Sequence, residues 1–442
     1  MQKVITQYKD LTRWDIKNYL WLFRSSFSVE PLGSYIYEHS EKEKIGDQVD
    51  KEFPILGVTN KIGVYLNEYV KSQKINQPYK KVKGGELTYN PYRVNVGSIG
   101  IVHDEYDNFF ISPAYVIFGT KEGLLNEYIY LVLSSDWFNP YLRAATSGSV
   151  RQNLTFDLLS QLKVPVPHLK IQEKIVSDWR KAEKETQELN KKAEEKEKAI
   201  DDYILCELGI EKKEYGKKKG AFVVCFKDLE EWGITKALMN KNLSFIKKIP
   251  LVKMSDVCVD FKNGVNFSAG QVGQGVKFVN IKDVYSEKYV NNENLERVKL
   301  SEKEIKNNQL KNNDLVFVRS SVKYEGVAYP SLIKTDKEPI VFCGFLIKCS
   351  PLANLIDPNY LLHLLKTSMY RNLLIALSVK TLITNISQDK IKDLKIPLPP
   401  LPKQKEIAEK VEKMRAEIQE IKNTADETLE QAKNKIGEML KV

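Results

Sequence analysis

The sequence predicts an α+β protein: two pseudo-symmetric mixed α/β units joined by two long helices, which form an antiparallel coiled coil within the chain. Three observations predict this fold. A proline-rich motif occurs twice, 232 residues apart, and a long segment with helical apolar periodicity follows each copy. Short apolar runs bounded by turn residues precede each copy, which is typical of strands.

The duplicated motif reads Val164-Pro165-Val166-Pro167-His168-Leu169 in the first copy and Ile396-Pro397-Leu398-Pro399-Pro400-Leu401 in the second. Residues 127–133 and 153–157 repeat at 359–365 and 385–389 in the same register. A unit that is present twice implies approximate two-fold symmetry, and its most economical use is to present two related binding surfaces at a fixed separation.

The first unit is expected over residues 1–165, with strands at 53–58, 63–66 and 98–102 and a helix over 124–138. The proline-rich motif ends any regular element, because proline lacks an amide donor and restricts the residue before it. A spacer at 166–210 then contains a helix over 171–208, with Gly209 as its stop.

A linker at residues 211–220 leads to a second unit over 221–395 and a second spacer helix within 396–442. The second unit begins as the first does, since Phe226-Lys227-Asp228-Leu229 with Trp232 matches Tyr8-Lys9-Asp10-Leu11 with Trp14. The offset is 218 at this start and 232 at the end, so insertions concentrate in the middle. Two copies that share a frame but differ in their central segments are suited to recognising two different targets.

Each helical segment carries an apolar seam at spacings of three and four residues, which is a coiled-coil signal. Neither helix can bury that seam alone, and the two seams have the same phase, with a polar interruption in each. We therefore expect the helices to pair with each other. The two seams are Ile175, Trp179, Ala182, Thr186, Leu189, Ala193, Lys196, Ile200 and Tyr203, and Ile407, Val411, Met414, Ile418, Ile421, Ala425, Thr428, Ala432 and Lys435.

The positive charge lies outside the helices. Of 68 Lys and Arg and 58 Asp and Glu residues, the two helical segments hold 17 and 19, which leaves 51 basic and 39 acidic residues elsewhere. Surplus positive charge on globular parts indicates a nucleic-acid partner. Five scattered cysteines without a C-x-x-C pair, and four separated histidines, predict a reducing compartment and no zinc site. Without a signal sequence or a membrane span, we expect a cytoplasmic protein.

A basic unit, a proline-rich exit followed by Gln404 and Ile407, and a long helix, all duplicated, resemble the DNA specificity (S) subunit of a Type I restriction–modification enzyme. The resemblance covers essentially the whole chain. The first copy departs from the pattern, with His168 and Lys170 where the second has Pro400 and Pro402, but Gln172 matches Gln404.

The resemblance implies that each unit is a target-recognition domain that reads one half of a split site on double-stranded DNA, and that the helices set the gap. It further implies partners: two modification (methyltransferase) subunits, which methylate adenine N6, and restriction (motor–nuclease) subunits. No cofactor is expected on this chain, whereas S-adenosylmethionine, ATP and Mg are expected on the partner subunits.

The chain is expected to be non-catalytic, because its candidate motifs are incomplete. Asn90-Pro91-Tyr92 lacks one proline of the amino-methyltransferase motif, and Gly216-Lys217 lacks the spacing of a P-loop. Four dispersed histidines support no catalytic triad.

Affinity for DNA comes mainly from Lys and Arg on phosphates, and specificity from Arg, Lys, Asn or Gln on base edges. Small-residue loops with cations and amides are therefore the best candidates, and Arg151 and Arg319 are the first choices because a guanidinium serves either purpose. The candidate DNA-binding residues are Lys80, Lys81, Arg93, Asn95, Ser98, Ser147, Ser149, Arg151 and Gln152 in the first unit, and Arg319, Ser320, Ser321, Lys323, Lys380 and Thr381 in the second.

Three other interpretations remain open from the residues alone. The chain could be the specificity subunit of a related Type II system, a coiled-coil scaffold that binds proteins, or a complete adenine methyltransferase.

Overall fold

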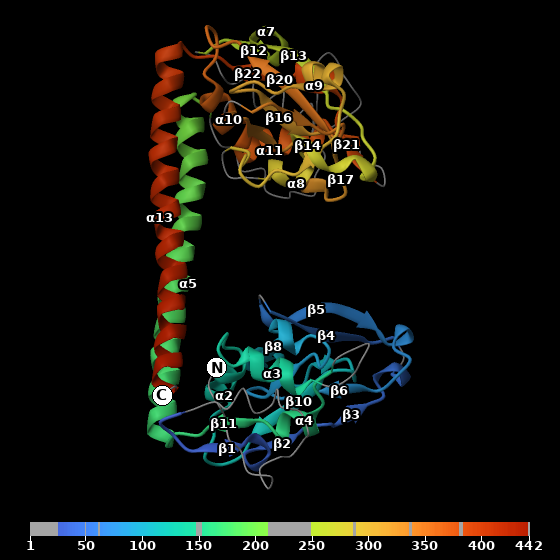
Figure 1. The fold of residues 1–442 in the computed structure, drawn as a ribbon, viewed down its shortest axis with the longest axis vertical. Helices are drawn as coiled ribbons and strands as arrows, with labels where there is room; N and C mark the ends of the chain where they lie inside the picture. Colours follow the sequence, from blue (N-terminus) through green and yellow to red (C-terminus); the bar gives the residue numbers. More distant parts are fainter. Residues whose placement is uncertain are drawn as a thin grey trace. The chain divides into compact units, whose positions relative to one another are not determined.

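The structure, a computed structural model, describes residues 25–48, 50–60, 62–146, 153–210, 249–285, 289–335, 338–379 and 383–440 (Figure 1). The chain divides into one unit of residues 1–190 with 423–442 and another of residues 191–422. Each unit therefore contains one globular part and a portion of each long helix. The predicted linker at 211–220 and the matched segments around Trp14 and Trp232 lie outside the described residues.

The two globular parts share a four-stranded antiparallel sheet of the same topology. In the first unit the strand order is β2 (Ile36–Glu38), β10 (Val116–Thr120), β7 (Leu87–Tyr89) and β8 (Ile99–Ile101). In the second it is β13 (Cys258–Asn263), β20 (Leu346–Pro351), β16 (Leu315–Val318) and β18 (Pro330–Leu332). The strands are rich in Val, Ile, Leu and Phe and are mostly buried, as residues that pack on both faces of a sheet must be.

The elements that follow each sheet repeat at the 232-residue offset. Helices α2 (Asn126–Leu133), α3 (Asn139–Ala145) and α4 (Phe156–Ser160) correspond to α10 (Pro358–Lys366), α11 (Ser368–Ala376) and α12 (Gln388–Lys392). Strand β11 (Lys163–Pro165) pairs with β1 (Val29–Pro31), and β22 (Lys395–Pro397) pairs with β12 (Leu251–Lys253). The long helices are α5 (Leu169–Glu207) and α13 (Leu401–Leu440).

The middles of the two units differ. The first has a five-stranded sheet in the order β3 (Lys42–Glu43), β6 (Tyr79–Lys81), β9 (Phe110–Ile111), β4 (Glu52–Thr59) and β5 (Gly63–Lys71). The second has a three-stranded sheet in the order β15 (Arg297–Val298), β14 (Val272–Val279) and β19 (Ile340–Phe342), with the short helices α8 (Ile281–Val284) and α9 (Glu302–Asn308). The short helix α7 (Met254–Val257) precedes β13 and lies outside this middle segment. The expectation of matching edges and different middles is confirmed.

The predicted strands at 53–58, 63–66 and 98–102 are confirmed as β4, β5 and β8. The single helix predicted over 124–138 is wrong, because α2 ends at Leu133 and a new helix, α3, begins at Asn139 with Pro140 in its first turn. Helix α5 ends two residues before Gly209, which has a φ of +66° and serves as the expected stop.

A buried glutamine holds the start of each long helix to its globular part. Gln172 is fully buried; its side chain accepts a hydrogen bond from the Leu125 amide (2.9 Å) and donates to the carbonyl oxygens of Gly123 (2.9 Å) and Pro167 (2.8 Å). Gln404 repeats these contacts with the Asp357 amide (2.8 Å) and the carbonyl oxygens of Leu355 (3.1 Å) and Pro399 (2.8 Å). We call this set of contacts the glutamine clamp.

A buried tyrosine closes the same region in both units. The hydroxyl groups of Tyr128 and Tyr360 donate to the carbonyl oxygens of Pro165 and Pro397, both at 2.8 Å. Burial raises the pKa of each phenol above its ordinary value, so both tyrosines remain neutral donors. Prolines interrupt the regular backbone hydrogen bonding of the exit segment. The glutamine and tyrosine side chains therefore donate the hydrogen bonds that its carbonyl groups need.

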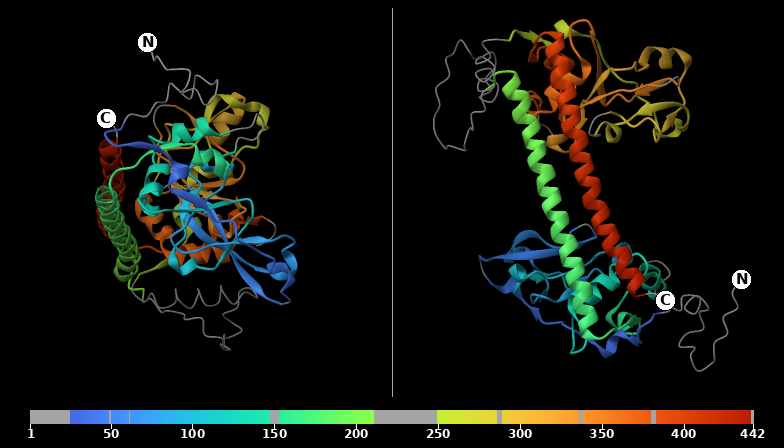
Figure 2. Two further views of the ribbon diagram at one scale, coloured as in Figure 1. Left: turned by 90° about the horizontal axis from the view of Figure 1, so that it is seen from below. Right: turned by 90° about the vertical axis from the view of Figure 1, so that its left-hand side faces the viewer.

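The two long helices pack antiparallel, as expected, and lie side by side in Figure 2. Within the second unit Lys196 pairs with Glu417 (2.5 Å) and Glu207 with Lys403 (2.6 Å), so residue numbers rise along one helix as they fall along the other. The seam between these ion pairs is apolar and well packed, with Ile200, Ile204, Ile407 and Val411 all buried.

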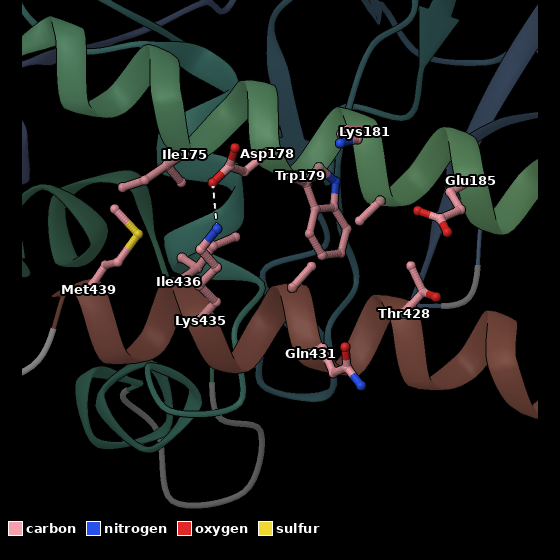
Figure 3. Close-up of a pocket in the computed structure, with 12 residues that line it drawn as sticks. Ile175, Asp178, Trp179, Lys181, Glu185, Thr428, Gln431, Lys435, Ile436 and Met439 are labelled. Atoms are coloured by element: carbon pink, nitrogen blue, oxygen red, sulfur yellow. Dashed lines mark hydrogen bonds and ion pairs between the residues drawn. The ribbon is translucent and has the colours of Figure 1, made fainter.

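Within the first unit the seam is less tightly packed. The Lys435 ammonium pairs with Asp178 at 2.9 Å, and the Thr186 hydroxyl donates to the Ala425 carbonyl oxygen at 3.3 Å. Between these contacts lies a pocket of about 290 Å³ that Trp179 and Ala432 help to line (Figure 3). At the matched position in the second unit, Ile200 occupies the place of Ala432 and is only 4% exposed. We interpret the pocket as incomplete packing of the helix pair.

We predict that Gln404→Leu lowers the free energy of unfolding by about 3 kcal/mol, because three backbone groups, one buried and two partly buried, lose their partner at about 1–3 kcal/mol each. Gln172→Leu is expected to act similarly in the first unit. Denaturant unfolding measures both, with Gln187→Leu on the exposed face of α5 as the control. A loss no larger than that of the control would mean that the clamp contributes nothing to stability.

We also predict that Ala432→Ile raises the free energy of unfolding by about 1 kcal/mol, because the added methylene and methyl groups enter the seam pocket. Ala416→Ile is the matched control, since Ala416 is exposed on the same helix and the new side chain would stay in water. Thermal unfolding of the two variants measures the difference. Equal behaviour of the two variants would contradict the prediction.

Candidate nucleic-acid interface

In the second unit the chain leaves the buried strand β16 at Arg319 and forms a short two-stranded ribbon. Strand β17 (Ser320–Ser321) pairs with β21 (Thr384–Asn385), and the Ile386 amide donates to the Arg319 carbonyl oxygen at 3.0 Å (Figure 1). The structure therefore brings the cluster around Arg319 beside the chain that follows the predicted residues Lys380 and Thr381. Those two residues lie outside the described part of the chain.

The polar side chains of this ribbon are used to shape it. The Ser320 hydroxyl donates to the Asn385 side-chain oxygen at 2.5 Å, and the Asn385 amide donates to the Ile383 carbonyl oxygen at 2.7 Å. The buried Ser321 hydroxyl donates to the Lys323 carbonyl oxygen at 2.7 Å. Both serines, predicted as DNA contacts, thus have intramolecular partners that hold the backbone in place.

Two cations accompany the ribbon. The Arg319 guanidinium is half-buried and donates to the Gly344 carbonyl oxygen at 3.2 Å, whereas the Lys323 side chain is exposed. A guanidinium has five donors, so one bond to Gly344 leaves others for a base edge or a phosphate. Arg319 and Lys323 thus lie on either side of β17 in the chain.

Arg371, which the sequence analysis did not identify, holds the loop that follows the ribbon. Its guanidinium donates to the carbonyl oxygens of Ala328 (2.6 Å), Val327 (2.7 Å) and Glu325 (3.0 Å), and it lies over the Tyr329 ring. Burial lowers the pKa of Arg371 to about 10, so the group is still charged at neutral pH. Ala328 has a φ of +53°, a conformation that non-glycine residues rarely adopt. The three bonds from Arg371 stabilise this turn.

The first unit places a different loop at the matched position. The Leu154 amide donates to the Pro91 carbonyl oxygen at 3.0 Å, as Ile386 does to Arg319. The loop that follows contains Arg93, which is exposed, and the predicted residue Asn95. Predicted Ser98 is buried and closes the loop, since its carbonyl oxygen accepts from Asn90 at 3.1 Å.

Asn90 has a local structural role. Its side-chain oxygen accepts a hydrogen bond from the Tyr92 amide at 3.0 Å, which forms a turn. The incomplete methyltransferase motif Asn90-Pro91-Tyr92 is therefore accounted for as the start of this loop.

The aromatic and basic stretch around Tyr79 divides into a buried and an accessible part. Lys80 is only 6% exposed; its ammonium donates to the Tyr115 carbonyl oxygen at 2.8 Å and lies 4.0 Å from Glu38. Burial lowers the pKa of Lys80. We assign Lys80 a structural role in place of the DNA contact predicted from sequence. Lys81 is partly exposed on the same strand, β6, because successive residues of a strand face opposite sides.

The remaining predicted residues of the first unit, Ser147, Ser149, Arg151 and Gln152, lie outside the described residues. Among the residues that the structure describes, no group of three or more His, Cys, Asp or Glu side chains could hold a metal ion. In the same described ranges, no helix is long and apolar enough to cross a membrane.

Comparison with known proteins places these features in a family. The family described as "Type I restriction modification DNA specificity domain" matches residues 40–197 and 247–431. The MjaVIII specificity subunit of Methanocaldococcus jannaschii is 24% identical over 440 residues, covering 91% of this chain and 95% of that subunit. The StySPI specificity subunit of Salmonella potsdam is 38% identical over 82 residues, which is 18% of each protein.

A solved structure has the same fold. It is described as "Structural basis underlying complex assembly and conformational transition of the type I R-M system", with a TM-score of 0.52, 14% identity, and coverage of 95% of this chain and 97% of that one. Because the family match covers most of both units, this chain belongs to the Type I restriction–modification DNA specificity subunits, a non-catalytic family.

Proposed function

We propose that the two units are target-recognition domains that read the two halves of a split site on double-stranded DNA, and that the helix pair sets the gap between them. Two methyltransferase subunits would dock on the chain and methylate adenine N6, and motor–nuclease subunits would complete the restriction enzyme. S-adenosylmethionine, ATP and Mg would be bound by these partners, in the cytoplasm.

One observation carries this proposal: the two units share one frame but differ in their middles. The loops that leave β7 and β16 are bonded at equivalent backbone positions, to Leu154 and Ile386. Their exposed side chains are nonetheless different, with Arg93 in one and Lys323 in the other. A repeated frame with different loops is suited to two different half-sites.

Cations and amides on these loops would make the DNA contacts, since phosphate contacts position a protein and base contacts specify the sequence. In the first unit we assign this role to Arg93, Lys81 and Asn95, together with the predicted loop of Ser147, Ser149, Arg151 and Gln152. In the second unit we assign it to Arg319 and Lys323 with Lys380 and Thr381. Ser98, Ser320 and Ser321 would act by shaping the loops.

The experiment that tests the function is co-expression of this chain with the methyltransferase subunit encoded beside it, followed by mapping of N6-methyladenine across the host DNA by single-molecule sequencing. A split motif with two half-sites and a constant gap is the expected result. Co-purification of the two proteins without any methylated motif and without duplex binding would favour a protein scaffold and contradict the proposal.

We predict that Arg93→Ala and Arg319→Ala relax recognition of different half-sites. Each substitution should weaken binding of the cognate duplex by about 1–3 kcal/mol if the guanidinium contacts a base. Fluorescence anisotropy with duplexes mutated in one half-site at a time measures the effect.

Arg180→Ala is the control for these variants, because Arg180 is exposed on α5, where it pairs with Glu127. It should leave both half-sites unchanged. Loss of discrimination at the same half-site in both the Arg93 and Arg319 variants would contradict the model of two readers.

A further inference from the structure

The edge of the second unit that carries Arg319 also carries exposed apolar side chains. Val322 is 84% exposed, Val379 is 64% exposed and Phe345 is 56% exposed. We call these three residues the apolar edge. Val322 directly follows β17, Val379 exchanges two backbone hydrogen bonds with Asn385 of β21, and the Phe345 carbonyl oxygen accepts from the Arg319 amide. Backbone hydrogen bonds thus join all three segments to the one ribbon.

Val322 is the most exposed of the large apolar side chains that the structure describes in the second unit. Hydrogen bonds hold the backbone on both sides of Val322. The Ser321 hydroxyl donates to the Lys323 carbonyl oxygen, and the Arg371 guanidinium donates to the Glu325 carbonyl oxygen in the loop that follows. A rigid backbone that presents an apolar side chain to water loses the free energy that burial would supply. An apolar partner for Val322 is therefore expected.

Charge on the same edge favours a polyanion as this partner. The cations Arg319 and Lys323 flank Val322 in the sequence, and Glu325 is the exposed acid nearby, with its carbonyl oxygen held by Arg371. A surface with cations around an apolar centre suits a polyanion that offers an apolar group between its phosphates. On duplex DNA the group that fits is the C5 methyl of thymine, which lies in the major groove.

A wedge between base pairs is the other apolar contact with DNA, and it uses longer side chains such as Phe, Leu, Ile or Met. Valine is short and branched at Cβ, so Val322 can cover a methyl group but reaches little beyond it, whereas a wedge would require the longer Phe345 of the same edge.

We propose that Val322 contacts the methyl group of a thymine in the half-site read by the second unit, and so contributes to its sequence specificity. This inference rests on the proposed function, because it requires a specific duplex. It predicts that one base of that half-site is thymine.

The test is a double-mutant cycle between the protein and the DNA. The complex of the full chain with its methyltransferase subunits binds duplexes of the mapped motif in which each thymine is replaced, one at a time, by deoxyuridine, which lacks only the methyl group. At one position in one half-site, the wild-type complex should lose affinity by a factor of about four, as burial of one methyl group predicts.

Val322→Ala should bind the thymine duplex about fourfold more weakly and should not respond to deoxyuridine at that position. Val259→Ala is the matched control: Val259 is 46% exposed on β13 of the same unit, and that variant should retain the full response to deoxyuridine. Val322 is exposed, so its truncation should leave folding unchanged.

Other outcomes would overturn the inference. The first is that Val322→Ala still loses affinity when the thymine is replaced by deoxyuridine. The second is that the complex binds its motif specifically but no thymine-to-deoxyuridine replacement weakens binding. The third is that the half-site contains no thymine. Binding that increases the fluorescence of 2-aminopurine beside the contact, without sensitivity to deoxyuridine, would instead identify a wedge. If the complex bound no duplex specifically, the proposed function would fail, which is distinguishable from these results.

Discussion

The glutamine clamp is the interaction on which the rest of the structure depends. A buried primary amide is costly unless its donors and acceptor are all used, and in both units they are used on the same three backbone groups. Those groups belong to the loop before α2 or α10 and to the proline-rich exit, so the clamp determines where each long helix starts against its globular part. Because Gln172 and Gln404 occupy equivalent positions on their helices, the two apolar seams begin in the same phase.

The clamp also explains how the two units can differ and still serve one architecture. The shared sheet, the three helices after it and the exit strand form a frame that depends on local contacts, whereas the second sheet is formed by the middle of each unit. A five-stranded sheet in one unit and a three-stranded sheet in the other are both accommodated. Loops that leave the frame at β7 and β16 can therefore change their side chains without changing the helix pair.

In the candidate DNA-binding edge of the second unit, some side chains position the backbone and others are exposed to a partner. The hydroxyl groups of Ser320 and Ser321, the Asn385 amide and the Arg371 guanidinium all bond to the protein itself. Their hydrogen bonds make the ribbon rigid before any partner arrives, which lowers the entropy cost of binding. Lys323 and Val322 remain exposed on that rigid backbone, so charge and apolar contact act from neighbouring positions.

The sequence by itself determined the duplication, the two long helices, their antiparallel pairing and the family, because proline positions, apolar periodicity and the repeat offset are properties of the chain that need no knowledge of distant contacts. It also located the loops around Arg93 and Arg319. Only the tertiary structure decided which of the predicted side chains are exposed to a partner. Lys80 is buried against Tyr115, and Ser98 and Ser321 are buried where they close their own loops. The tertiary structure also revealed Arg371, which supports a turn more than 40 residues before it. The break between α2 and α3 was likewise decided by the fold. Burial and hydrogen-bond partners arise where segments far apart in the sequence meet, and a residue type or spacing does not specify that meeting.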